Sequence, residues 1–219
     1  MTINLIVAMC KNKGIGRSNS MPWNLPKDLK YFRKLTIGNR KNAIIMGKNT
    51  WKSTGFLNNR DNLILSTTLQ LDHTENGHVI KSFYNMEELT RYLSMANYDN
   101  TWIIGGAQIY EQFIHTNVLD YIHLTYIDEI YECDTFFPDI PDNYLSYNYD
   151  VCDELTETGK QTYRLTYKRL QTGMMVKYKD TQWSVVGIHF DDYPQCYFTI
   201  RNDEGREIQT VKSKIKLLA

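Results

Sequence analysis

One carboxylate stands out among the residues that could do chemistry, and it is Asp28. Leu25, Leu29 and Phe32 recur at helical spacing around it, so a helix over about residues 26–35 would place Asp28 near an apolar face. Burial there would raise the carboxyl pKa and suit the group to proton work near neutral pH. The alternative is a solvated acid in a first helical turn, favoured by the helix dipole. The pattern leaves both interpretations open.

Two glycine-containing turns could accept phosphate. In Thr101–Tyr110 and again in Ile44–Trp51, an apolar run leads through glycine into the expected start of a helix. Glycine lets a ligand approach the backbone, and the N–H groups of a helix start favour an anion. Lys48 and Thr50 can meet phosphate oxygens, so the two turns together suit a dinucleotide. Neither carries the full dinucleotide fingerprint, and each alone could be a plain turn or a capped helix with an exposed lysine.

The elements that must position these residues alternate along the chain. Helical spacing predicts four helices, over about residues 26–35, 48–53, 86–95 and 109–114. Apolar runs predict strands at residues 3–9, 42–46, 62–66, 79–80, 101–104, 119–127 and 163–170. This alternation predicts an α/β protein with helices on both faces of its sheet.

The pattern of apolar and turn-forming residues changes near residue 171. Short β-type runs at 174–178, 183–190, 196–200 and 207–211 are separated by turn clusters, which indicates a small all-β unit. We therefore expect two domains, at residues 1–170 and 171–219. The strands at 182–187 and 197–201 resemble those of a small SH3-like or Tudor-like barrel, a likeness that says little about function.

Composition excludes several classes of protein. The 219 residues carry 25 bases and 25 acids, so the basic excess usual for nucleic-acid or membrane-surface binding is absent. No apolar run approaches the roughly 20 residues that span a bilayer, and the short apolar N-terminus lacks a basic start. The cysteines show no Cys-x-x-Cys motif and no metal-ligand spacing with histidine, which predicts free thiols, no metal and a cytoplasmic location; they are Cys10, Cys133, Cys152 and Cys196.

Read together, six segments closely resemble dihydrofolate reductases. They fall in that family's order and at its spacing, and they are Gly14–Phe32, Ile45–Trp51, Asn62–Ser66, Ile103–Tyr110, Leu124–Thr125 and Asp134–Pro138. The resemblance covers about residues 1–170. It implies a mixed, mostly parallel central sheet flanked by helices. It also implies NADPH-dependent reduction of 7,8-dihydrofolate to tetrahydrofolate, for one-carbon and thymidylate metabolism, with hydride added at C6 and a proton at N5.

The resemblance assigns the chemical roles. Asp28 would accept paired hydrogen bonds from the pterin and tune its electrostatics, while water brings the proton to N5. Thr125 would hydrogen-bond Asp28, and Trp23 would help hold that water. Met21 would lie in the loop that closes over the nicotinamide. Asp134 would hydrogen-bond the backbone of that loop near Gly16 and so bias its closure.

The same resemblance implies the binding residues. Arg60 would clamp the substrate's α-carboxylate, with apolar walls around the two rings; the substrate set is Ile6, Ala8, Leu29, Phe32, Thr54, Leu57, Arg60, Ile104 and Tyr110. A cis peptide is implied between the paired glycines at the pyrophosphate. The NADPH set is Ala8, Ile15, Gly16, Gly47, Lys48, Asn49, Thr50, Leu65, Ser66, Thr67, Ile104, Gly105, Gly106, Ala107, Gln108, Ile109 and Tyr110.

Several positions depart from the family pattern. Asn59 replaces the usual glycine before the clamp arginine, and asparagine can adopt the left-handed conformation that glycine would use. Thr54 is more polar than the usual isoleucine, which would weaken the binding of apolar antifolates. Thr67-Thr68 supplies no arginine for the 2′-phosphate of NADPH, so Lys48, with Lys81 as a second candidate, would have to provide the charge.

Two other functions are alternatives to the reductase. A pyrimidine reductase of riboflavin synthesis shares the fold, but its substrate has no pterin or glutamate tail for Asp28 and Arg60 to bind. A non-catalytic binder that works through its tail would have no use for Asp28, Trp23 and Thr125. We expect a monomer that binds dihydrofolate and antifolates and no nucleic acid, with residues 171–219 open to a protein partner, a dimer contact or a purely stabilising role.

Overall fold

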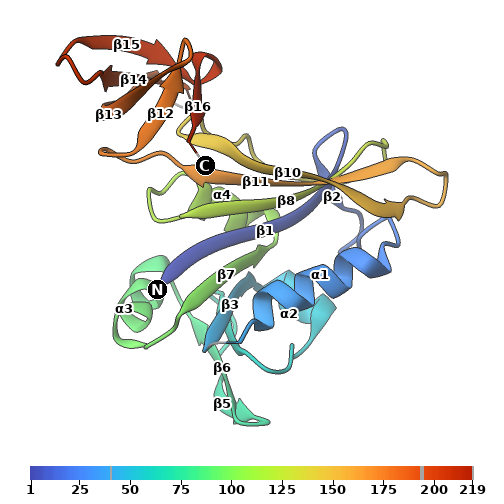
Figure 1. Cartoon of the computed structure of the whole chain (residues 1–219). Coiled ribbons are helices and arrows are strands. Elements are labelled where there is room, and N and C mark those ends of the chain that lie inside the picture. The colour runs from blue at the N-terminus through green and yellow to red at the C-terminus, as the bar shows by residue number, and fades with distance from the viewer. Residues whose placement is uncertain (40, 193–194, 219) are drawn as a thin grey trace. The chain divides into compact units, whose positions relative to one another are not determined.

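The computed structural model describes residues 1–39, 41–192 and 195–218 (Figure 1). The chain divides into two compact units. The first unit comprises residues 1–138 and 151–164, and the second comprises 139–150 and 165–219.

A nine-stranded sheet carries the first unit, in the order β10-β11-β8-β1-β7-β3-β4-β6-β5. β1 pairs in parallel with β7 and β8, and β3 pairs in parallel with β4 and β7, whereas β5 runs antiparallel to β6. The predicted mixed, mostly parallel sheet is thereby confirmed. The strands are β1 (Thr2–Cys10), β3 (Asn42–Gly47), β4 (Asp61–Leu65), β5 (Asp72–Glu75), β6 (His78–Phe83), β7 (Asn100–Gly105), β8 (Tyr121–Ile127), β10 (Tyr144–Leu155) and β11 (Gln161–Arg169).

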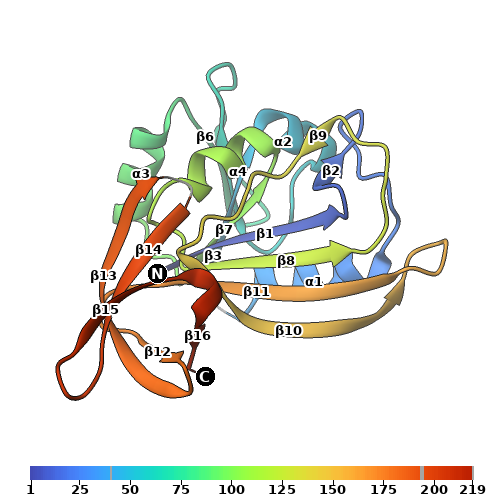
Figure 2. The ribbon, with the colours of Figure 1, turned by 90° about the horizontal axis from the view of Figure 1, so that it is seen from above.

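Four helices flank this sheet in the described part of the chain: α1 (Pro26–Ile37), α2 (Lys48–Thr54), α3 (Met86–Met95) and α4 (Ala107–Ile114). Figure 2 shows α1 on one side of the sheet and α3 and α4 on the other, as expected. Phe32 and Leu35 of α1 pack against a buried cluster that includes Ile44 and Met46 of β3. Among these helices, none is long and apolar enough to cross a membrane.

The parallel strands bring the chemically interesting turns to one edge. α2 begins directly after β3, and α4 begins directly after Gly106, which follows β7. Because the carboxyl ends of parallel strands meet at the same edge, the two glycine turns lie near each other. A small ribbon adds to this edge, formed by β2 (Gly14–Gly16) and β9 (Thr135–Phe136).

Strand β10 was not predicted, and its surroundings explain why. Six consecutive residues, 146–151, are exposed, because β10 is the outermost strand of the sheet. An edge strand that is exposed on both faces has no alternation of apolar and polar residues to reveal it. The same reason holds for β5, whose four residues are all exposed.

The second unit contains a five-stranded antiparallel sheet, in the order β15-β14-β13-β12-β16. The predicted all-β appendage is confirmed, and the short β16 and the preceding 3-10 helix are additions to it. The elements are β12 (Met175–Tyr178), β13 (Thr181–Asp192), β14 (Gln195–Arg201), β15 (Glu207–Val211), η1 (Lys212–Lys214) and β16 (Ile215–Leu217). The SH3-like likeness of this sheet stays a prediction.

The core of the second unit includes side chains from before residue 171. Val176, Val185 and Phe198 are fully buried there, together with Leu145 and Leu170 from before residue 171. Because β10 and β11 each run through both units, the limits of the compact units differ from the predicted division at 170/171. That division stays a prediction.

Phe198 should be the principal packing residue of this second core. Phe198→Ala is expected to lower the free energy of unfolding of the appendage by about 3–5 kcal/mol, because a buried aromatic side chain leaves a cavity. Denaturant unfolding followed by tryptophan fluorescence would measure this, since Trp183 lies in the same cluster. Val211→Ala, on an exposed position of β15, is the matched control; equal effects of the two changes would contradict the assignment of this core.

Candidate active site

A cavity of about 1320 Å³ lies at the carboxyl edge of the parallel strands. Ala8, Gly47, Leu65 and Gly105, each at or near the end of a different strand, contribute to its wall. Every residue predicted for the site lines this cavity, with the exception of Trp23. The lining also contains residues that were not predicted, among them Val7, Asn19, Ser20, Arg33, Ser53, Phe56, Asn58, Thr68, Tyr84, Asn85, Met86, Gln112, Thr135 and Phe136.

Asp28 lies on the cavity wall, where a short hydrogen bond holds its carboxylate. The hydroxyl of Thr125, on β8, donates to a carboxylate oxygen of Asp28 at 2.6 Å. Burial raises the pKa of Asp28 above its ordinary value, while the Thr125 hydrogen bond and the charge of Arg164 oppose the rise and the charge of Glu154 adds to it. Of the two interpretations of Asp28, the structure therefore supports the desolvated carboxylate rather than the solvated one.

The two residues expected near the reacting rings are placed differently. Trp23 is buried with Cys10, Leu25 and Ile127, outside the cavity lining. Its predicted water-holding role therefore stays a prediction. Met21 lines the cavity and is 49% exposed, as a residue of a closing loop would be.

Asp134 contacts the predicted loop, and its hydrogen bonds reach both Gly16 and Ser18. Its backbone N–H donates to the carbonyl of Gly16 at 3.1 Å, and its carboxylate accepts from the N–H of Ser18 at 2.7 Å. The hydrogen bond from Ser18, followed by that from Thr135, lowers the pKa of Asp134. The acid is thus ionised under ordinary conditions and holds the loop through residues 16–18.

Arg60 is a buried cation. Only 4% of the residue is exposed; one guanidinium nitrogen donates to the carbonyl of Asn58 at 3.1 Å, and Nε has no hydrogen-bond partner among the described residues. Burial, followed by the charge of Arg33, lowers the pKa of Arg60 to about 10. Its Cζ lies 5.7 Å from the centre of the Phe32 ring. Desolvated positive charge at a cavity wall favours an anionic ligand.

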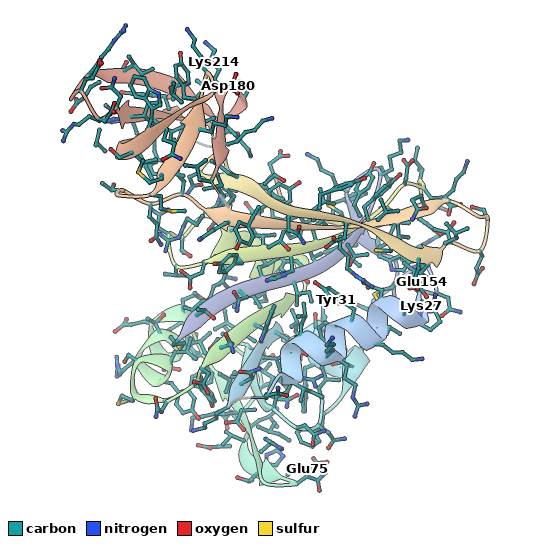
Figure 3. All side chains as sticks on the ribbon, viewed as in Figure 1. Lys27, Tyr31, Glu75, Glu154, Asp180 and Lys214 are labelled. Atoms are coloured by element: carbon teal, nitrogen blue, oxygen red, sulfur yellow. The ribbon has the colours of Figure 1, made fainter. Side chains whose placement is uncertain are left out.

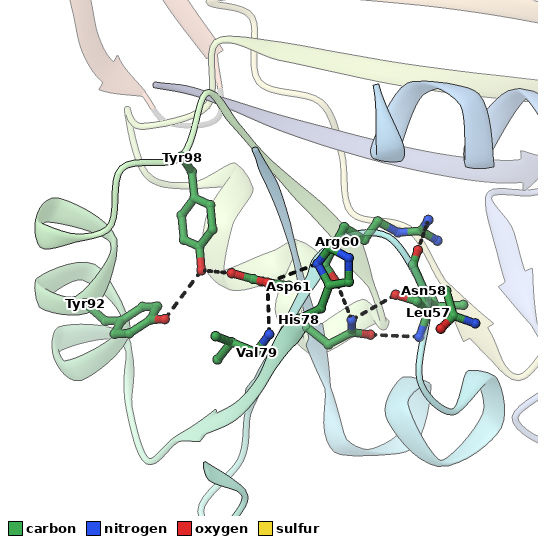
Figure 4. A network of polar contacts seen from close by, with 9 residues as sticks. Leu57, Asn58, Arg60, Asp61, His78, Val79, Tyr92 and Tyr98 are labelled. Carbon is green, nitrogen blue, oxygen red and sulfur yellow. Dashed lines mark hydrogen bonds and ion pairs between the residues drawn. The ribbon is translucent and has the colours of Figure 1, made fainter. Parts of the chain in front are cut away.

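The loop before Arg60 is fixed by a residue that the sequence reasoning missed. The fully buried side chain of Asn62 accepts from the N–H of Leu57 at 3.0 Å. Its amide nitrogen donates to the carbonyls of Leu57 and Arg60, at 3.0 and 2.8 Å. Figure 4 shows Leu57, Asn58 and Arg60 of this loop close together. Asn59 takes the left-handed conformation that was predicted, with φ of 67°. An asparagine at the start of an otherwise apolar strand was the available signal.

The glycine turns also line the cavity. The peptide between Gly105 and Gly106 is cis, as the resemblance implied. Gly105 has φ of +119°, and a Cβ there would lie 3.1 Å from the Tyr110 hydroxyl, so no other residue fits without strain. A Cβ on Gly106 would lie 3.4 Å from the Thr50 hydroxyl. The two turns therefore approach each other closely, and the backbone between them is open to a ligand.

A polar cluster follows at the end of β4. The Lys48 ammonium group donates to the hydroxyl of Thr68 at 2.7 Å, and Ser66 accepts from the backbone of Thr68 at 3.2 Å. Lys81, the second candidate for the positive charge, is instead ion-paired with Asp72 and does not line the cavity. Lys48 is thus the better supported of the two cations, and within the described residues no cluster of three or more His, Cys, Asp and Glu could hold a metal.

Comparisons with known proteins agree with this geometry. The family model for dihydrofolate reductase matches residues 2–172. A dihydrofolate reductase of Drosophila melanogaster is 36% identical over 153 residues, covering 66% of this chain and 83% of that protein. Bifunctional dihydrofolate reductase-thymidylate synthase 1 of Arabidopsis thaliana is 31% identical over 183 residues, covering 78% of this chain but 35% of the relative.

A solved structure gives the same result. It is dihydrofolate reductase from Enterococcus faecalis complexed with NADP(H) and RAB-propyl, at 28% identity and a TM-score of 0.65, covering 78% of this chain and 97% of the other. Fold, cavity and relatives together define the protein as an oxidoreductase. The chain belongs to the dihydrofolate reductase family.

The Asn62 contacts should be important for the wall that carries Leu57 and Arg60. Asn62→Ala is expected to lower the free energy of unfolding by about 2 kcal/mol or more, because buried backbone groups lose their partners. Asn76→Gly is the matched control: it removes an exposed 3.0 Å hydrogen bond to Asn58 and keeps the positive φ of that position. Thermal denaturation of both variants is the measurement, and an Asn62 variant as stable as the control would refute the argument.

Proposed function

We propose that this chain reduces 7,8-dihydrofolate to 5,6,7,8-tetrahydrofolate with NADPH, the activity that its family membership favours. The observation that carries the proposal is Asp28, a partly buried carboxylate held by Thr125 on the wall of the cavity. The two glycine turns line the same cavity, so one cavity offers sites for a pterin and for a dinucleotide.

The substrate would be bound at two charged ends with apolar contacts between. Asp28 would accept hydrogen bonds from the pterin amino group and ring N–H, which is strong, paired recognition. Leu29 is 48% exposed although apolar, because it faces the cavity, and with Phe32 and Leu57 it would wall the rings. Arg60 would clamp the α-carboxylate; its buried and incompletely bonded guanidinium supports this role.

NADPH fits the glycine side of the cavity and would supply the hydride. The close approach of Gly105, Gly106 and Thr50 leaves backbone N–H groups and a hydroxyl for the pyrophosphate. Lys48 and the hydroxyls of Ser66 and Thr68 would meet the 2′-phosphate, so a single cation would secure the preference for NADPH over NADH. The backbone of Ala8 and Ile15 would face the nicotinamide.

Asp28 would act through charge rather than by touching the protonated atom. An ionised carboxylate in a desolvated site raises the basicity of a bound pterin. Water would then deliver the proton at N5, with Met21 and the loop held by Asp134 controlling access. The cytoplasmic location, the monomeric state and a partner for the appendage stay predictions.

Asp28→Asn should remove the charge while preserving shape. We expect kcat/KM for dihydrofolate to fall roughly 10²-fold or more, since hydrogen bonds to a charged group are worth about 1.5–3 kcal/mol each. Oxidation of NADPH, followed by its absorbance, measures this, and Asp28→Glu, which retains a carboxylate, should recover part of the loss. A folded native chain that binds NADPH without turning over dihydrofolate would overturn the proposed function.

Asp28→Asn should raise the stability of the folded protein although it lowers activity. Burial holds the folded-state pKa of Asp28 above the ordinary 3.8, so the unfolded chain releases this proton first as the pH rises. The native chain therefore loses stability as the pH climbs through the unfolded and then the folded pKa, and it stays less stable above both. At neutral pH, Asp28→Asn should melt at a higher temperature than the native chain. This difference in melting temperature should vanish at about pH 3.

Asp153→Asn is the control for that melting experiment. A hydrogen bond and the charge of Lys27 lower the pKa of Asp153, so its carboxylate stabilises the folded state at neutral pH and the substitution should not raise the melting temperature. If Asp28→Asn melted at the native temperature throughout the pH range, Asp28 would not be desolvated.

A further inference from the structure

Resting on the proposed function, we propose that Glu154 is a positioning residue for Asp28. From β10, its carboxylate completes the first turn of α1 and so fixes the backbone that presents the substrate-binding acid to Thr125.

The start of α1 has no cap of its own. Leu25 occupies the N-cap position, where its side chain can accept nothing, and Pro26 has no N–H to satisfy. The next two N–H groups, of Lys27 and Asp28, both donate to Glu154, one to each carboxylate oxygen, at 2.8 Å. A negative charge at this position also complements the helix dipole. Glu154 thus accepts hydrogen bonds from the first N–H groups of α1, as the side chain of an N-cap serine or aspartate does in other helices.

Glu154 is itself held in place. The hydroxyl of Thr162, on β11, donates to its backbone carbonyl at 2.6 Å. The preceding residue, Asp153, forms an ion pair with the side chain of Lys27 at 2.9 Å. Figure 3 shows Glu154 and Lys27 side by side at the beginning of α1. The strand and the helix start are therefore joined by two hydrogen bonds from backbone N–H groups to the Glu154 carboxylate. The Lys27 ammonium group adds an exposed ion pair with Asp153 and a hydrogen bond to its carbonyl.

Asp28 is consequently fixed at two points. Its N–H is bound by Glu154, and its carboxylate is bound by Thr125 on β8, on the other side of the residue. The charged and titratable groups that face Asp28 are Glu154 and Cys152 on β10 and Arg164 on β11. The negative charge of Glu154 raises the pKa of Asp28 and Arg164 lowers it, so Glu154 acts on both the place and the ionisation of this acid.

Two variants of Glu154 separate these effects. Glu154→Gln removes the charge and turns one acceptor into a donor, and Glu154→Asp keeps the charge but shortens the reach. We expect both to lower kcat/KM for dihydrofolate roughly tenfold, mainly through KM, because Asp28 loses its fixed backbone. Only Glu154→Gln should move the acidic limb of the kcat/KM profile to lower pH, whereas Arg164→Gln should move it to higher pH.

Glu157→Gln is the matched control, since it removes an exposed acid from the turn that joins β10 and β11. It should leave both KM and the pH profile as in the native chain. A ¹³C NMR titration of the Asp28 carboxyl in the ligand-free protein gives a readout that does not need turnover, and the Asp28 pKa should fall in Glu154→Gln and not in Glu157→Gln.

The outcomes distinguish this inference from the proposed function. An inactive native chain would overturn the reductase assignment, whereas the NMR titration would still report on Glu154. An active native chain, with Glu154→Gln matching Glu157→Gln in KM, pH profile and Asp28 titration, would overturn the positioning role. A general loss of stability would lower activity without shifting the Asp28 pKa, and this result would also refute the proposal.

Discussion

The structure depends on keeping one carboxylate out of bulk water and in a fixed place. Burial raises the pKa of Asp28, so water-poor surroundings act against the charged form that would bind a pterin. The hydroxyl of Thr125 offsets part of this cost, and the sheet supplies Thr125 on the strand next to β1. The order of the central strands therefore has a chemical meaning, since it sets the groups that face Asp28.

A second charged residue of the cavity wall is also held in unfavourable surroundings. Arg60 is nearly inaccessible and incompletely hydrogen-bonded, an arrangement that is unfavourable in the ligand-free protein. Asn62 holds the loop in spite of that unfavourable energy, through hydrogen bonds with both the backbone N–H and the carbonyl of Leu57. Binding sites commonly contain such locally unfavourable groups, which the surrounding fold stabilises.

Much of this was predictable from sequence where the signal was local. Pro26 marked the first turn of α1, and Asn59 was expected in the left-handed region in which it lies. The signal is weaker where contacts are distant. The position of the Trp23 ring depends on its packing with Ile127, which is far from it along the chain. Glu154 was missed for the same reason, because an acid in an exposed edge strand has no local pattern that shows which helix it caps.

The cap on α1 also has a consequence for how the protein is made. The hydrogen bond from Asp28 to Glu154 joins residues that are 126 positions apart. Nascent chains emerge N-terminus first, so the helix that carries Asp28 leaves the ribosome long before the residue that completes its first turn. Contacts of such sequence separation form slowly, because the closure entropy of a long loop precedes any gain. The active site should accordingly be among the last parts of the first unit to mature during synthesis.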